Sequence, residues 1–163
     1  MLIRKAKRED LPVINEIYNH SVLTKMSTAD IDALSIEDRE DWFDSHDEDH
    51  YPVFVSELKG QVVGWISISP YRPGRRALRY TAEVSYYVHH DYQNAGIGTM
   101  LLEYAITNAY KYNIKTLFAI LLDNNIASIK LLKKFNFEQW GYLPGVADFD
   151  GVEVGQYYFG RKI

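Results

Sequence analysis

The chain has 163 residues, of which 47% are apolar and 25% are charged, values that are ordinary for a folded globular protein. A chain of this length buries about two-thirds of its unfolded surface, so we expect a single domain over residues 1–163. The net charge of −4 gives no general attraction to nucleic acid. The chain contains no cysteine, which excludes disulfides, thiolate metal sites and a cysteine nucleophile.

The N-terminal sequence lacks the apolar core of a signal peptide. No apolar run approaches the roughly 20 residues that a helix needs to cross a membrane. We therefore expect a soluble, cytoplasmic protein that binds neither membrane nor nucleic acid.

The first half of the chain predicts three strands and two helices. The expected strands are 2–6, 52–58 and 62–69. Apolar residues recur at helical spacing from Leu11 to Val22, and Ser35 with Asp38 is typical of the start of a second helix. Lys59-Gly60 predicts the turn of a hairpin between the second and third strands.

The second half predicts four more strands and two more helices. In chain order, these are a strand over 81–88, a helix from 97, a strand over 115–122, a helix over 125–135, and strands over 137–143 and 154–163. The order β-α-α-β-β-β-α-β-α-β-β predicts an α/β (α+β) domain with a central mixed sheet flanked by helices.

The segment "VSYYVHHDYQNAGIGTMLLEYAI", residues 84–106, passes from a strand through a glycine-containing loop into a helix. The first amides of a helix have no internal partners and favour anions, so this junction predicts a phosphate site. A dinucleotide fingerprint would need a third glycine at Leu101, and a Walker loop would need lysine at Thr99. A tight turn without a ligand is the alternative interpretation.

The spacing Gln-x-x-Gly-x-Gly in this loop resembles the acetyl-CoA motif of the GCN5-related N-acetyltransferases, the GNAT superfamily. Within it the chain resembles the phosphinothricin and methionine sulfoximine acetyltransferases. The segments that carry the resemblance are "EIYNHSV", "YPVFVSELKGQVVGW", "RYTAEVSYYVHHDYQNAGIG" and "DNNIASIKLLKKFNF", in that order. The resemblance implies a mostly antiparallel GNAT sheet, acetyl-CoA as cosubstrate, a small-molecule amine as acceptor, and a homodimer.

The resemblance also implies which residues hold the cofactor. The backbone of Tyr86, Tyr87 and Val88 would pair with the pantetheine, although all three are also plausible core residues. The loop would hold the pyrophosphate through Gln93, Asn94, Ala95, Gly96, Ile97, Gly98 and Thr99. Asn125 would contact the pantetheine or cap a helix, and Lys134 would meet a phosphate or lie in solvent.

For catalysis, the resemblance identifies Glu83 as the general base that takes the proton of the acceptor amine. Partial burial would raise the pKa of this carboxyl toward a working range, whereas a solvent-facing strand glutamate would have no such role. Tyr71, Arg72, Arg79 and Tyr80 are candidates for the acceptor site, because an arginine fork can bind the carboxylate of an amino acid. A solvated basic loop is the alternative.

The function stays open in two respects: one expected proton donor is missing, and the acceptor has several candidates. Leu132 stands where the resembled proteins carry a histidine or tyrosine that donates a proton to the leaving thiolate, and leucine cannot donate. The expected acceptor is the α-amino group of a small amino acid or analogue. The alternative acceptors are a polyamine, an aminoglycoside or a protein N-terminus. A non-catalytic CoA-binding domain is the alternative to an enzyme.

His89 and His90 lack the spacing of a metal site, so we expect no metal.

Overall fold

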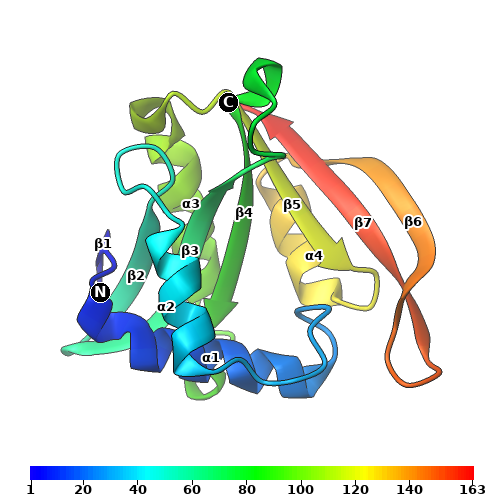
Figure 1. The fold of residues 1–163 in the computed structure, drawn as a ribbon, viewed down its shortest axis with the longest axis horizontal. Coiled ribbons are helices and arrows are strands. Elements are labelled where there is room, and N and C mark those ends of the chain that lie inside the picture. The colour runs from blue at the N-terminus through cyan, green and yellow to red at the C-terminus, as the bar shows by residue number, and fades with distance from the viewer.

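The computed structural model describes residues 1–163, which form a seven-stranded sheet with helices against its faces (Figure 1). The strands are β1 Leu2–Lys5, β2 Val53–Leu58, β3 Gln61–Pro70, β4 Thr81–Val88, β5 Thr116–Leu122, β6 Glu138–Asp148 and β7 Glu153–Lys162. The helices are α1 Leu11–Thr24, α2 Ile36–Asp44, α3 Ile97–Asn108 and α4 Ile126–Lys134. The element order predicted from the sequence is confirmed.

The strands lie in the order β1-β2-β3-β4-β5-β7-β6. Every neighbouring pair is antiparallel except β4 and β5, which are parallel, so the predicted mixed and mostly antiparallel sheet is confirmed. No helix in the structure combines the length and the apolar character needed to cross a membrane.

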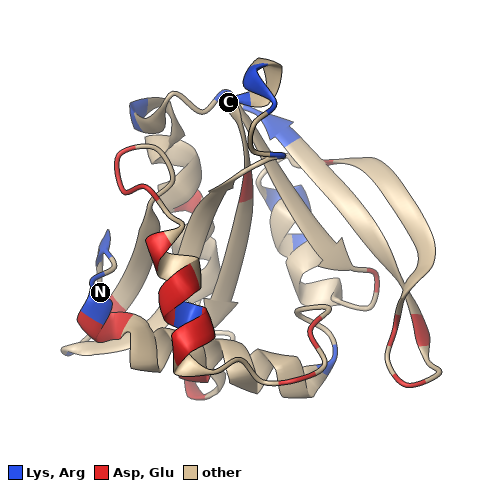
Figure 2. Ribbon diagram, in the orientation of Figure 1, with Lys and Arg blue, Asp and Glu red and all other residues tan.

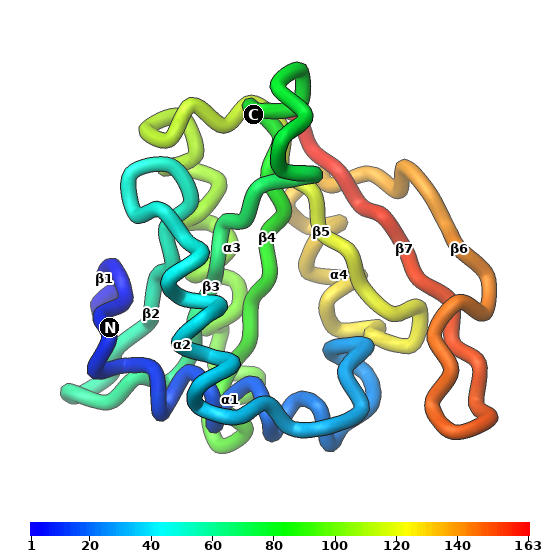
Figure 3. Tube along the Cα trace, viewed as in Figure 1, coloured from blue at the N-terminus to red at the C-terminus, as the bar shows by residue number.

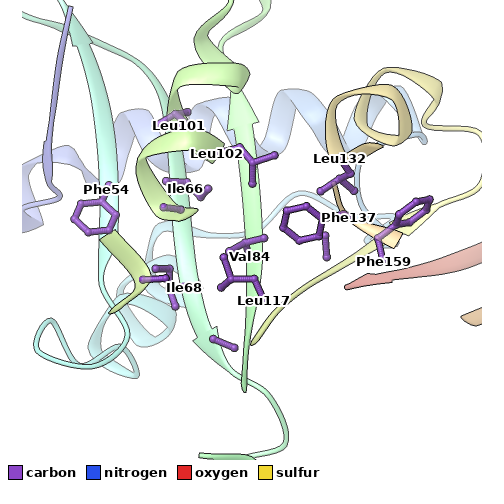
Figure 4. Close-up of a cluster of buried hydrophobic side chains, with 14 of the residues drawn as sticks. Phe54, Ile66, Ile68, Val84, Leu101, Leu102, Leu117, Leu132, Phe137 and Phe159 are labelled. Carbon is purple, nitrogen blue, oxygen red and sulfur yellow. The ribbon is translucent and has the colours of Figure 1, made fainter. Parts of the chain in front are cut away.

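Each face of the sheet carries its own apolar cluster, because side chains alternate between the faces along a strand. On one face, Ile66 and Val84 pack against α3 and α4 in a cluster of 18 buried residues (Figure 4). On the other face, Trp65 and Val55 pack against α1 in a cluster of seven, with Trp42 of α2 beside it. The two helix layers are therefore held by alternate residues of the same strands.

Two local predictions are confirmed, and one strand is longer than predicted. Lys59 and Gly60 have φ values of 50° and 80°, the left-handed conformation that suits a tight hairpin turn. The Ser35 hydroxyl accepts from the Asp38 amide at 3.0 Å and caps α2. β6 extends five residues beyond the predicted end at 143, because it stays paired with β7 across two shifts of register.

The parallel pair β4 and β5 is short. Only Thr81–Glu83 and Thr116–Phe118 lie in register, and both strands then continue without pairing to each other. The trace shows the two strands separating in the middle of the sheet, with α4 behind the gap (Figure 3). This fork leaves one edge of β4 beyond Glu83 without a strand neighbour.

Candidate active site

The structure has a cavity of about 400 Å³ at the fork between β4 and β5. Its wall on β4 is the run Val84–Val88, and its wall on β5 is the run Ala119–Leu121. The loop before α3 and the first turns of α4 complete the lining. The cavity therefore lies where the separated strands expose unpaired backbone to a ligand.

The free edge of β4 indicates which hydrogen-bonding groups a ligand in the cavity would carry. The other edge of β4 pairs with β3 along its whole length, from Ala82 with Pro70 to Val88 with Gly64. On the cavity side, the N–H and C=O groups after Glu83 have no strand partner. An extended molecule with amide groups can satisfy them as an added strand would. Tyr86, Tyr87 and Val88, predicted to contact pantetheine, all line the cavity.

The loop between β4 and α3 forms one end of the cavity. Asn94 and Gly96 have positive φ values of 61° and 79°, which turn the chain sharply into α3. The amides of the first helical turn consequently face the junction without internal partners. Of the predicted loop residues, six line the cavity: Gln93, Asn94, Gly96, Ile97, Gly98 and Thr99. Ala95 does not.

Asn125 performs the structural role that was one of its two predicted roles. Its side-chain oxygen accepts from the Ser128 amide at 3.1 Å and caps α4. It also lines the cavity, so capping leaves it available to a ligand. Lys134, by contrast, lies exposed in the last turn of α4 and is not part of the lining.

Four residues that the sequence analysis missed close the cavity from the other side. Ser21 and Thr24 come from the end of α1, and Met26 and Ser27 from the connection to α2. The Asn124 amide donates to the Lys25 carbonyl at 3.4 Å and joins this connection to the start of α4. The last of these residues, Ser27, precedes the start of β4 at Thr81 by 54 positions, and no motif in the sequence predicts the contact.

Glu83 lies at the point where β4 and β5 separate, opposite Phe118 in the last paired position. It faces the α1–α2 side of the sheet, since its neighbours Ala82 and Val84 pack on the opposite side. Its carboxylate is half-buried and forms no hydrogen bond with another residue. Burial raises the pKa of the Glu83 carboxyl above its ordinary value, in the direction expected for a general base.

A second feature next to Glu83 was also not predicted. Ser69 lies opposite Glu83 on β3, and its hydroxyl is 3.0 Å from Nε2 of His46. Nδ1 of His46 is 2.8 Å from the Trp42 carbonyl, which can only accept, so Nδ1 carries the proton and Nε2 accepts from Ser69. Burial lowers the pKa of His46, which favours this neutral form. This side of the sheet thus holds polar groups from β4, from β3 and from the segment after α2.

The predicted acceptor residues lie at the other end of β4, outside the cavity. Tyr71 stacks on Phe118 with ring centroids 4.8 Å apart. The Arg79 guanidinium lies 4.3 Å from the ring centre of Tyr80 and donates to the carbonyl of its own loop at 3.0 Å. Arg72 is exposed. Neither arginine forms an ion pair in the chain. Figure 2 shows the basic residues of this loop gathered at one end of the molecule.

The donor atoms of His89, His90 and Asp91 lie within 4.8 Å of one another. The two imidazole rings stack at an angle of 19°, and His90 and Asp91 are exposed. The expectation that no metal binds stays a prediction.

The sequence profile of the acetyltransferase (GNAT) family matches residues 14–137. The chain belongs to this family. YwnH of Bacillus subtilis strain 168 is 37% identical over 164 residues, covering 100% of this chain and 99% of its own length. The L-methionine sulfoximine/L-methionine sulfone acetyltransferase of Salmonella typhimurium is 34% identical over 157 residues, 96% of this chain and 89% of its own.

Among solved structures, the phosphinothricin acetyltransferase of Sinorhizobium meliloti in complex with AcCoA superposes with a TM-score of 0.92 at 26% identity. It covers 99% of this chain and 88% of its own. The resemblance read from the sequence is confirmed, and the chain is an N-acetyltransferase rather than a non-catalytic domain.

Replacement of Asn125 by alanine removes the cap of α4. We expect Asn125→Ala to lower the free energy of unfolding by about 1 kcal/mol, because the Ser128 amide loses its acceptor. Asn125→Ser retains a capping oxygen and should lose only a few tenths of that amount. Urea denaturation of the wild type and both variants measures the free energies of unfolding. If Asn125→Ala is as stable as the wild type, the cap does not contribute to stability.

Proposed function

We propose that the cavity at the fork binds acetyl-CoA, with the pantetheine along the free edge of β4 and the pyrophosphate on the amides before α3. The observation that carries the proposal is the unpaired backbone of β4 beyond Glu83, which adjoins a helix N-terminus at the same cavity. The phosphinothricin acetyltransferase structure named above contains AcCoA, which supports this assignment.

The proposed reaction is direct attack of a neutral amine on the thioester carbon. The nitrogen forms a bond to the acetyl carbon, and the carbon–sulfur bond breaks with its electron pair passing to sulfur. The amine loses one proton, and Glu83 takes it directly or through one water. Glu83 is suited to this role because its carboxylate is half-buried, has no competing hydrogen bond, and lies where the strands separate.

We propose the α-amino group of a small amino acid or amino-acid analogue as the acceptor. The named activity of the Salmonella relative supports this class. Arg79 lies two residues before the start of β4 at Thr81, and Arg72 lies two residues after Pro70 of β3, which pairs with Ala82. Neither arginine has a carboxylate partner of its own. A substrate carboxylate would supply that partner, and the amine would then face Glu83.

A panel of amines tests the acceptor class by release of free CoA from acetyl-CoA. We expect turnover with small amino acids, methionine sulfoximine or phosphinothricin, and none with spermidine or an aminoglycoside. Arg72→Ala and Arg79→Ala should raise the acceptor KM about tenfold or more, because each removes a charge-assisted hydrogen bond. Arg75→Ala, in the same exposed loop, is the matched control and should behave as wild type. Turnover with polyamines alone would overturn the acceptor class.

The general base is tested by Glu83→Gln. We expect kcat to fall by about 100-fold or more, with little change in acetyl-CoA affinity, because the amide cannot take a proton. In the wild type, kcat should rise with pH through the raised pKa of Glu83, since only the ionised carboxylate is a base. In Glu83→Gln, kcat should not rise with pH. The control is Glu103→Gln, which changes an exposed residue of α3. If the wild type, Glu83→Gln and Glu103→Gln have equal kcat values, Glu83 does not take part in the reaction.

We also propose a homodimer that uses the outer strand β6. Large apolar side chains on and next to this strand are 41–64% exposed: Trp140, Tyr142, Leu143, Val146 and Val152. Exposed apolar groups on an edge strand favour association with a second copy. Sedimentation should give a species of about twice 18.9 kDa, and Val146→Asp should shift it toward the single chain. A wild type that sediments only as one chain would contradict this.

A further inference from the structure

Glu83 has a hydroxyl group beside it that binds another residue. Ser69 of β3 lies directly opposite Glu83 of β4. In such a pair the Cβ atoms are about 4.5–5.5 Å apart on the same face of the sheet, so a serine hydroxyl is within reach of the carboxylate. A hydrogen bond to an ionised carboxylate is about twice as strong as one between neutral groups. The Ser69 hydroxyl nevertheless bonds to Nε2 of His46, at 3.0 Å, and not to Glu83.

Two contacts hold His46 in place to accept this hydrogen bond. Its Nδ1 donates at 2.8 Å to the carbonyl of Trp42, one of the last four carbonyls of α2, which lack partners inside the helix. The Trp42 ring packs on Trp65 of β3 with ring centroids 5.4 Å apart, which holds this end of α2 against the sheet. Nε2 therefore lies next to β3 as an acceptor, and Ser69 is the residue that donates to it.

The hydrogen bond between Ser69 and His46 has a consequence for Glu83. A serine hydroxyl has one proton, so while Ser69 donates to His46 it has only oxygen lone pairs to offer Glu83. Lone pairs do not stabilise a carboxylate. The carboxylate thus lacks a donor that would lower its pKa, and burial raises this pKa above its ordinary value. A raised pKa makes the ionised carboxylate a stronger base toward the amine proton.

The surrounding groups favour a neutral imidazole. Burial lowers the pKa of His46, and the positive charge of Arg39 on α2 acts in the same direction, although the bond to the helix carbonyl opposes both. An imidazolium would donate from Nε2, free the serine proton and add a positive charge near Glu83. On β4, burial raises the pKa of Tyr87, so its hydroxyl is neutral, and β5 presents the apolar Phe118 opposite Glu83.

We propose that His46 is a positioning residue, which accepts the Ser69 proton and thereby keeps the Glu83 carboxylate free to act as the base. This inference rests on the proposed role of Glu83. No proton passes through His46, because the amine proton goes to Glu83 and then to solvent while Ser69 keeps its own. If His46 only capped α2, its bond from Nδ1 would be sufficient, so the effect of Nε2 separates the two roles.

The first test measures the ionisation of Glu83 without turnover. NMR of protein labelled at the glutamate carboxyl carbons follows, against pH, the signal that is missing in Glu83→Gln. In His46→Phe, the freed Ser69 hydroxyl donates to the carboxylate, and we expect the midpoint to fall by about one pH unit. His46→Gln retains an acceptor near the position of Nε2 and should titrate like the wild type. The control is His50→Phe, which changes an exposed histidine nearby.

Two further variants separate the hydroxyl from packing. In His46→Asn, the shorter amide can still donate to the helix carbonyl but does not reach Ser69, so the midpoint should fall as in His46→Phe. Ser69→Ala removes the hydroxyl that these substitutions set free. In the double variant Ser69→Ala/His46→Phe, the midpoint should therefore return to that of Ser69→Ala alone. If the double variant shows the same fall as His46→Phe, the hydroxyl is not the cause and the inference is wrong.

The second test follows the pH dependence of kcat in the same variants. In His46→Phe and His46→Asn, the rise of kcat should move to lower pH by the same amount as the carboxyl midpoint. The plateau should fall about threefold to tenfold, because the base is weaker. If neither the carboxyl signal nor the kcat profile moves in these two variants, the inference is wrong. If the carboxyl signal moves and the kcat profile does not follow, His46 controls Glu83 as inferred, and the proposed role of Glu83 as base is wrong.

Discussion

The separation of β4 from β5 is the constraint on which the rest of the site depends. Three residues of each strand lie in register, and beyond Glu83 the edge of β4 is left without a strand neighbour. Unpaired backbone in a sheet is costly unless solvent or a ligand satisfies it, so a fork in the middle of a sheet offers hydrogen-bonding groups to a ligand. The cavity of about 400 Å³ lies at this fork, and α3 and α4 begin beside it.

The side chains of β4 alternate between the two faces of the sheet. Glu83 faces α1 and α2, together with Ser69 and His46, whereas Tyr86 faces α3 and α4. A thioester held at the fork would therefore meet its proposed base, Glu83, from the α1–α2 side of the sheet.

The fold was predictable to the extent that its signals are local. Apolar periodicity predicted α1, and turn chemistry predicted the hairpin at Lys59-Gly60, where two positive φ values favour such residues. The glycine loop and Asn125 were found by motif, and both line the cavity. The resemblance to known acetyltransferases identified Glu83, whose burial in the structure agrees with a raised pKa.

The remaining parts depend on contacts between distant segments. Met26 and Ser27 reach the cavity only because the α1–α2 connection crosses to α4, and no spacing in the sequence encodes that crossing. Nothing in the sequence distinguishes His46 from a surface histidine. Its contact with Ser69 of β3 appears only in the folded structure. Tyr86 was predicted to act through its backbone alone, and the structure leaves that stretch of β4 without a strand neighbour.

The most direct measurement is a crystal structure of the protein with CoA. The account predicts that the pantetheine runs along β4 from Val84 to Val88 and that the pyrophosphate lies on the amides of residues 96–99. CoA bound at another surface, or a pantetheine arm that makes no backbone hydrogen bond to β4, would contradict it.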